Sequence, residues 1–239
     1  MTKQMKLYWK LYLEWFPNEK ILDEFYNPIK SYSRERSKKV IDIGCGQSQY
    51  LIDLLESDFE LFAVDTEKSQ LNFLEERVKQ FGYQKDRITY SSKEFPSEDF
   101  EGLFFSAIIV SNLLHFFTKP EAYIFVEGLS KYCDSDSLIL ITVHSSDHLS
   151  NKEKITSSSY FKSFYSKKDL YEMFPNTEYE YVSYVEKEKE PSNYKKQFLM
   201  HWINEYYKEK YLPFQIQKIQ EDYLKTCRIN SIDFVVRKR

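Results

Sequence analysis

The sequence has 239 residues, of which 42% are hydrophobic, 30% charged and 18% aromatic, and its formal net charge is −3. This composition excludes wholesale disorder and favours one large globular domain, or one domain that carries an appendage. The small negative net charge argues against a nucleic-acid partner, because it provides no field that would concentrate phosphate backbones at the surface.

Cysteine content and hydropathy indicate a cytoplasmic protein. The three cysteines, Cys45, Cys133 and Cys227, are too few and too scattered for a disulfide scaffold or a zinc ribbon, so we expect a reducing compartment. The first residues lack the apolar core of a signal peptide. The longest uncharged run, residues 102–117, is shorter than the roughly 20 apolar residues of a membrane-spanning helix. We therefore expect no membrane contact.

Most of the chain alternates between two hydrophobic patterns. Helical spacing of apolar and aromatic residues predicts an amphipathic helix over residues 5–16. Short apolar runs predict strands at residues 40–43, 61–64, 88–90, 107–110 and 138–143, and helical patterns between them lie at 50–56, 69–81 and 121–132. This alternation is typical of an α/β fold with a doubly wound, mostly parallel sheet and helices on both faces.

The last third of the sequence departs from this alternation. Ser166 is the expected cap of a short helix that ends at Phe174, and strands are predicted at residues 179–185 and 232–236. About 45 residues separate these two strands, far more than a hairpin loop needs. The expected organisation is therefore one domain over residues 1–239, with an N-terminal helical cap (1–37), a core sheet (38–185), a helical insertion broken at Pro213 (191–227) and a last strand (231–236).

The most informative motif is the glycine pair in Val40-Ile-Asp-Ile-Gly44-Cys-Gly46-Gln-Ser48. It follows a predicted strand and precedes a predicted helix, where glycines allow backbone amides to approach a ligand. Asp65 ends the next strand about 20 residues later, the spacing at which an acid accepts ribose hydroxyls in nucleotide-binding folds. Gln49 occupies the position of the third glycine of a dinucleotide fingerprint, which disfavours an NAD-dependent oxidoreductase.

Together with Ala63-Val64-Asp65, this motif resembles the class I S-adenosylmethionine-dependent methyltransferases over residues 38–185 and the last strand. The resemblance implies a mixed seven-stranded sheet and S-adenosyl-L-methionine as the cofactor. The cofactor-binding residues that it implies are Asp42, Gly44, Cys45, Gly46, Ser48, Asp65, Thr66, Ser92, Ser111 and Asn112. The sequence departs from the family at Ser48, where a third glycine is common, and at Ser91, Ser92 and Ser106, where acids are common.

His115 and His144 are the candidate catalytic residues, because each follows a predicted strand at the sheet edge where ligands bind. Either could orient or deprotonate a methyl acceptor; the alternative is that both are hydrogen-bonded loop histidines with no chemical role. His148 lies four residues after His144, but this spacing converges on a metal only in a helix, so we expect no metal site. Cys45 is expected to act through its backbone, and Cys133 and Cys227 to pack at helix ends.

Aromatic residues suggest where an acceptor binds. Trp9 and Tyr12 in the N-terminal helix and Trp202 in the insertion are candidate substrate-binding residues, with packing on the sheet or a dimer contact as the alternative. The loop from Ser111 to His115 lacks the Asn-Pro-Pro-aromatic and Pro-Cys patterns of methyltransferases that act on nucleic-acid bases. We therefore expect a small-molecule acceptor. A protein side chain as acceptor, a non-catalytic cofactor-binding or sensor protein, and a homodimer stay open.

Overall fold

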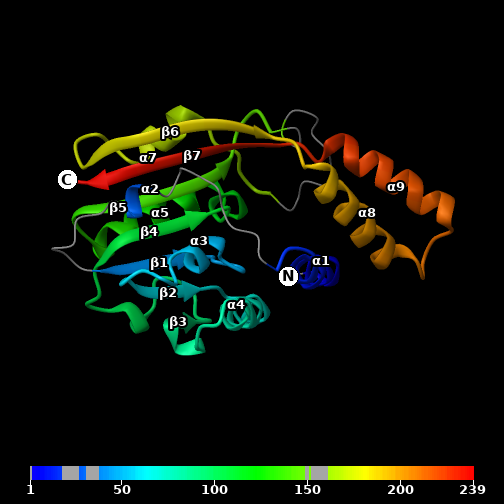
Figure 1. Cartoon of the computed structure of the whole chain (residues 1–239). Coiled ribbons are helices and arrows are strands. Elements are labelled where there is room, and N and C mark those ends of the chain that lie inside the picture. The colour runs from blue at the N-terminus through cyan, green and yellow to red at the C-terminus, as the bar shows by residue number, and fades with distance from the viewer. Residues whose placement is uncertain (1, 18–26, 31–37, 149–150, 152–160) are drawn as a thin grey trace.

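Seven strands form one sheet (Figure 1). Their order is β3 (Ile88–Ser91), β2 (Glu60–Val64), β1 (Lys39–Ile43), β4 (Phe105–Ser111), β5 (Cys133–His144), β7 (Ile229–Lys238) and β6 (Tyr179–Lys189). The strands from β3 to β5 pair in parallel, and β7 runs antiparallel to both β5 and β6. The structure, a computed structural model, describes residues 2–17, 27–30, 38–148, 151 and 161–239.

Helices cover both faces of this sheet and one of its ends. They are α1 (Lys3–Trp15), α2 (Asn27–Lys30), α3 (Gln49–Asp53), α4 (Lys68–Gln80), α5 (Lys119–Leu129), α7 (Lys167–Met173), α8 (Asn193–Tyr207) and α9 (Pro213–Thr226). The helices α5 and α7 pack on one face, and α2, α3 and α4 pack on the other. The sheet is therefore doubly wound, as predicted.

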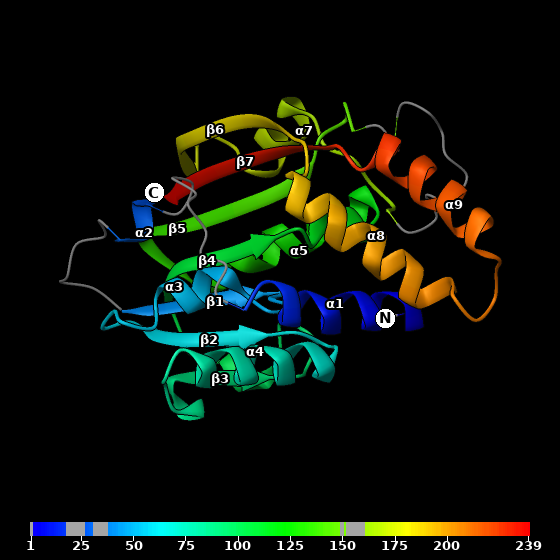
Figure 2. The same ribbon diagram turned by 45° about the vertical axis from the view of Figure 1, so that its right-hand side comes forward.

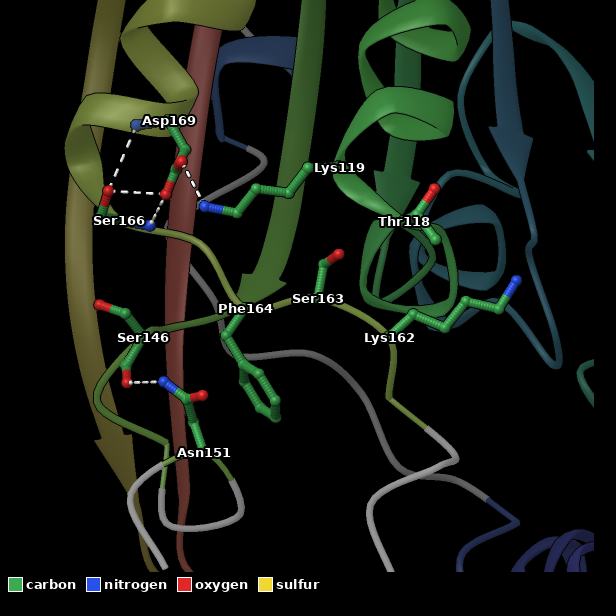
Figure 3. A pocket seen from close by; sticks show the side chains of 9 residues that line it. All are labelled: Thr118, Lys119, Ser146, Asn151, Lys162, Ser163, Phe164, Ser166 and Asp169. Atoms are coloured by element: carbon green, nitrogen blue, oxygen red, sulfur yellow. Dashed lines mark hydrogen bonds and ion pairs between the residues drawn. The ribbon is translucent and has the colours of Figure 1, made fainter. Parts of the chain in front are cut away.

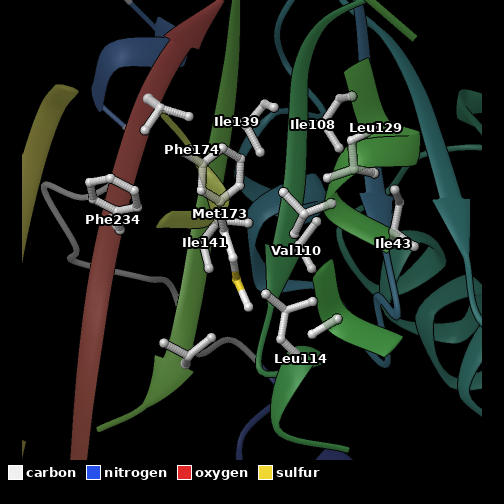
Figure 4. Close-up of a cluster of buried hydrophobic side chains, with 14 of the residues drawn as sticks. Ile43, Ile108, Val110, Leu114, Leu129, Ile139, Ile141, Met173, Phe174 and Phe234 are labelled. Atoms are coloured by element: carbon white, nitrogen blue, oxygen red, sulfur yellow. The ribbon is translucent and has the colours of Figure 1, made fainter. Parts of the chain in front are cut away.

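Alternation along the strands produces two cores. Ile41 and Ile43 of β1 pack with α5 and α7, whereas Val40 packs with α3 and α4, because successive side chains of a strand point to opposite faces. Figure 4 shows the first of these cores, where Val110 and Ile141 from neighbouring strands meet residues of α5 and α7. Burial on both faces explains why the central strands are almost continuously apolar.

A third cluster holds α1, α8 and α9 together at the end of the sheet towards which the parallel strands point (Figure 2). Its buried residues are Leu11 of α1, Ile216 of α9, and Phe198, Leu199, Trp202 and Ile203 of α8. Because α8 and α9 lie between β6 and β7, they form the predicted helical insertion. The predicted fold class is confirmed, including the N-terminal helix and this insertion.

The strand β5 corrects two details of the sequence analysis. It begins at Cys133, which was expected at a helix end, and it extends beyond the predicted strand at 138–143 to include residues 134–137 and His144. The register shifts between Phe105 and Ala107, and Asp136 adopts a φ of 68°. The Ser137 hydroxyl donates to the Phe105 carbonyl (2.8 Å), so a side chain replaces part of the interrupted ladder.

The last strand is also longer than predicted. It was expected to end at residue 236, but Arg237 and Lys238 also belong to β7. Each forms an ion pair with β6 or the residue just before it: Arg237 with Glu180 (3.2 Å) and Lys238 with Glu178 (2.8 Å). These ion pairs between neighbouring strands stabilise β7 beyond its apolar residues. The local sequence pattern does not show them, because the partners are far apart in the chain.

Candidate active site

The glycine turn after β1 is the centre of the candidate site. Gly44 and Gly46 have positive φ angles of 67° and 51°, a conformation that L side chains rarely adopt. A Cβ atom on Gly44 would lie 2.8 Å from Cδ1 of Leu113 in the loop after β4. A Cβ atom on Gly46 would meet no atom of the described residues within 4 Å. The turn is therefore packed against the β4 loop at Gly44 and open at Gly46.

Asp65 connects the end of β2 to this turn. Its Oδ2 accepts the backbone amide of Gly46 (2.9 Å), and its Oδ1 accepts that of Glu67 (2.8 Å). The amide of Cys45 donates to the carbonyl of Val64 (3.0 Å), which brings the two strand ends together. Burial raises the pKa of the Asp65 carboxyl. Each carboxylate oxygen can still accept a second donor, so this fixed side chain can bind a ligand with two hydroxyls.

Asp42 and Ser48 support the turn from inside. The Ser48 hydroxyl donates to Oδ2 of Asp42 (2.6 Å) and accepts the amide of Leu51 (3.0 Å), so it caps α3. Asp42 is buried, and its burial raises the pKa of the carboxyl to about 7. Its Oδ1 is buried and has no hydrogen-bond partner among the described residues. Asp42 thus acts on the turn through Ser48.

The end of β3 presents an acid that sequence analysis missed. Ser92 is exposed there, and the hydroxyl of the buried Ser91 donates to Oδ2 of Asp99 (3.0 Å). Lys93 pairs with the other oxygen of Asp99 (2.6 Å). A carboxylate therefore lies at the end of β3 although it comes from eight residues further along the chain, where no local pattern indicates it.

The ends of β2 and β4 complete the edge. Thr66 is exposed after β2, and Ser111 ends β4 half-buried. Asn112 is exposed with a φ of 56°, and its backbone amide donates to the Thr142 carbonyl of β5 (2.8 Å). The strand order reverses between β1 and β4, and ligands of doubly wound sheets bind at such a reversal.

Residues 40–135 match the family model described as a methyltransferase domain. This span contains the glycine turn, Asp65 and the loop after β4. This match identifies a methyltransferase domain over these residues. It agrees with the resemblance that the glycine turn and Asp65 predicted. The curated proteins contain no match to the sequence.

Solved structures share the fold of this protein at low sequence identity. The [4+2]-cyclase SpnF has a TM-score of 0.66 and 12% identity, with 98% of this chain and 94% of that chain covered. A protein described as a sarcosine dimethylglycine methyltransferase from Galdieria sulphuraria has a TM-score of 0.64 and 11% identity, covering 96% and 97%. Coclaurine N-methyltransferase bound to N-methylheliamine and SAH has a TM-score of 0.60 and 10% identity, covering 92% and 74%. At such identities the likeness shows the fold alone.

The helix α1 is attached directly to the glycine turn. Gln47 Nε2 donates to the carbonyl of Trp9 (3.0 Å), and Gln49 Nε2 donates to the hydroxyl of Tyr12 (3.3 Å). The buried guanidinium of Arg77 donates to the Gln47 carbonyl (3.0 Å) from the opposite side. Two of the three residues predicted to bind substrate, Trp9 and Tyr12, therefore lie against the turn.

A buried polar chain crosses the sheet beside the site, and sequence analysis missed it. The Tyr50 hydroxyl lies 3.5 Å from Oγ of Ser111 and contacts the hydroxyl of Thr142, which donates to Asp233 (2.9 Å). Lys187 Nζ pairs with the other oxygen of Asp233 (2.5 Å). The only sequence signal is a polar residue inside each of two apolar strands, which gives no indication that the two residues meet.

The structure stacks three histidines in one column. The rings of His115 and His144 lie 4.0 Å apart at 19°, and those of His144 and His148 lie 4.5 Å apart at 11°. Phe161 packs edge-on against His144 at 4.5 Å. The two candidate catalytic residues are therefore in contact, and His148 joins them. His115 follows β4 as predicted, whereas His144 is the last residue of β5 rather than a residue after it.

Burial keeps these imidazoles neutral. It lowers the pKa of His115 to about 2 and that of His144 to about 3, with a smaller contribution from the neighbouring histidines, and it also lowers the pKa of His148. The Nδ1 atoms of His115 and His144 are buried without a hydrogen-bond partner among the described residues. Neutral imidazoles of low basicity suit accepting a hydrogen bond better than removing a proton.

One pocket has a volume of about 640 Å³. Figure 3 shows the side chains that line it. Its lining includes Lys119, Lys162, Phe164 and Asp169. Phe164 contacts the column, with its ring 5.6 Å from that of His148. Lys119 pairs with Asp169 (2.5 Å), so the pocket wall carries charges of both signs.

Trp202 lies away from these features. It is 3% exposed, its indole Nε1 donates to the Gln4 carbonyl (3.1 Å), and its ring packs against Tyr8 and Tyr223. Such burial favours the alternative of a packing role over a pocket wall.

Two further results concern the residues that the structure describes. None of their helices is long and apolar enough to cross a membrane. Their His, Cys, Asp and Glu side chains form no group of three that could hold a metal ion.

Proposed function

We propose that this protein transfers a methyl group from S-adenosyl-L-methionine to a small-molecule acceptor. One observation carries the cofactor assignment: Asp65 is held by the Gly46 amide at the point where the strand order reverses. Open space at Gly46 and a fixed carboxylate fit a ligand with a ribose diol and a charged tail.

In this proposal each strand end has a role towards the cofactor. Asp65 accepts the two ribose hydroxyls, and the backbone from Gly44 to Gly46 faces the methionine portion. Thr66 and Ser92 flank the adenine, while Ser111 and Asn112 border the methionine end. When bound, the cofactor supplies a methyl group activated by a positively charged sulfur. Asp42 and Ser48 keep the turn in shape.

The acceptor is proposed to bind between the glycine turn, α1 and the histidine column. Its reacting atom has to be held in line with the methyl group, about 3 to 3.5 Å away, and positioning supplies much of the rate. His115 and His144 would accept a hydrogen bond from the acceptor and orient it, since their low pKa values make them weak bases. The attachment of α1 to the turn supports a small acceptor, because the helix covers the edge of the site.

Calorimetry and methyl transfer together test this proposal. Wild-type protein and Asp65→Ala are titrated with S-adenosylhomocysteine, and wild-type protein is incubated with labelled S-adenosylmethionine, a panel of small amines, alcohols and acids, and a protein extract. Tight binding in the wild type and label in a small molecule support the proposal. Binding without transfer would make the protein a non-catalytic binder, and label only in protein would indicate a side-chain methyltransferase. No binding would refute the cofactor assignment.

A further inference from the structure

Four aromatic rings surround a cationic site between α1 and α8. Tyr8, Tyr12 and Phe16 form a column on α1, with interplanar angles of 23° and 29° between successive rings. Phe198 of α8 is buried and stands across the column at angles of 73° to 83°. The four rings are called the aromatic cage below.

The ammonium group of Lys195 occupies this cage. Its Nζ lies 3.9 Å from the ring centroid of Tyr12, 4.6 Å from that of Phe16, 5.0 Å from that of Phe198 and 5.7 Å from that of Tyr8. All four distances are within the range of a cation–π interaction, in which the negative ring face attracts a cation. The protein's own ammonium therefore shows which class of chemical group the cage accepts.

The helix itself gives no electrostatic reason for a lysine at this position. Lys195 lies in the first turn of α8, and its backbone amide donates to the capping hydroxyl of Ser192 (3.2 Å). Positive charge is unfavourable at a helix N-terminus, where acids are preferred. The interaction of Lys195 with the cage offsets this cost.

The cage adjoins the cofactor edge. Tyr12 belongs to both, because its ring faces Lys195 and its hydroxyl accepts the hydrogen bond from Gln49 at the start of α3. One turn of helix earlier, the Trp9 carbonyl accepts from Gln47 of the glycine turn. A molecule with its ammonium group in the cage would therefore lie next to the turn.

We infer that the aromatic cage binds the ammonium group of the methyl acceptor and that Lys195 fills the cage until the acceptor displaces it. The acceptor class is an amine. Its ammonium form binds in the cage and loses a proton to solvent, and the neutral nitrogen then attacks the methyl group while the S–C bond breaks and S-adenosylhomocysteine leaves. The N-methylated ammonium product fits the same cage because aromatic rings bind alkylated ammonium groups well. The acceptor role rests on the proposed function, whereas ammonium binding by the cage does not.

Choline and its neutral isostere 3,3-dimethylbutan-1-ol provide the direct test. Calorimetry compares the wild type with Lys195→Met, which keeps the apolar stem and removes the charge, and with Lys195→Met/Tyr12→Leu. Lys195→Met should bind choline about fivefold more tightly than the wild type does, and the double variant should lose this gain. Neither variant should bind the neutral isostere more tightly than the wild type does. Lys210→Met is the matched control, since Lys210 lies over the single ring of Tyr206 (4.3 Å). Unchanged choline affinity in Lys195→Met, or equal gains for both probes, would refute the cage.

The acceptor role is tested separately. Lys195→Met and the wild type receive labelled S-adenosylmethionine and the small-molecule panel, and S-adenosylhomocysteine affinity and melting temperature show that each variant is folded. Label in amines, with a lower KM in Lys195→Met, is expected. Label only in compounds without an amine would overturn the acceptor assignment. Absence of any transfer would reject the proposed function, and the choline titration would still report on the cage.

Discussion

The backbone amide of Gly46 donates to the carboxylate of Asp65 at 2.9 Å, although the two residues are 19 positions apart. This bond joins the turn after β1 to the end of β2, so the Asp65 carboxylate shapes the turn. In the proposed function the same carboxylate also binds the cofactor, and a substitution at Asp65 is then expected to change both the turn and cofactor affinity.

Asp65→Ala should weaken S-adenosylhomocysteine binding at least about tenfold. The change removes a charged acceptor from two hydroxyls, each such bond being worth roughly 1.5 to 3 kcal/mol. Calorimetry on the folded variant measures the effect, and Asp86→Ala, an exposed acid before β3, is the control. Unchanged affinity would mean that the cofactor binds elsewhere.

The two glycines of the turn should respond differently to alanine. Gly44→Ala places a Cβ atom 2.8 Å from Leu113 and should lower the free energy of unfolding. The Cβ atom of Gly46→Ala would contact no atom of the described residues. The free energy of unfolding should therefore fall by only the roughly 1 to 2 kcal/mol that an alanine costs in the left-handed conformation, and the main effect should be a lower affinity for the cofactor. Gly82→Ala is the control for backbone strain alone, because Gly82 has a φ of 84° and a Cβ atom there would also contact nothing within 4 Å among the described residues. Equal losses of stability at both positions would contradict the open side of the turn.

The histidine column should make the protein sensitive to acid. Because the pKa values of His115 and His144 are lower in the folded protein, the unfolded chain binds more protons below about pH 6.5. Their contribution to stability is fully present above pH 6.5 and falls as pH decreases, by up to roughly 2 kcal/mol for each residue at pH 5. Urea unfolding at pH 5 and 7.5 should show a smaller loss in His144→Gln than in the wild type. His201→Gln on α8 is the control. The prediction would be refuted if His144→Gln lost as much stability between pH 7.5 and pH 5 as the wild type does.

Trp202→Ala should destabilise the protein by about 3 to 5 kcal/mol, the typical cost of removing a buried tryptophan. Trp202→Phe should cost less than Trp202→Ala, because it keeps an aromatic ring and removes only part of the buried indole together with the hydrogen bond to Gln4. Urea unfolding measures both. If Trp202→Ala kept its stability and lost only methyl transfer, Trp202 would line the acceptor site after all.

The sequence by itself determined the sheet, the methyltransferase domain and the glycine motif. These features are local: a glycine pair needs particular φ angles, an apolar run needs burial, and Asp65 needs only to end the next strand. The lengths of β5 and β7 were underestimated because their ends rest on Ser137 and on cross-strand ion pairs rather than on apolar residues.

Tertiary structure alone decided which polar and aromatic side chains meet. Thr142 and Asp233 are 91 positions apart, and Lys195 reaches the rings of α1 from a helix near the other end of the chain. His115 after β4 and His144 at the end of β5 stack because the two strands are neighbours in the sheet, and burial then lowers the pKa values of both imidazoles. Contacts between distant segments and the desolvation that follows from them depend on packing, which no local pattern of residues encodes.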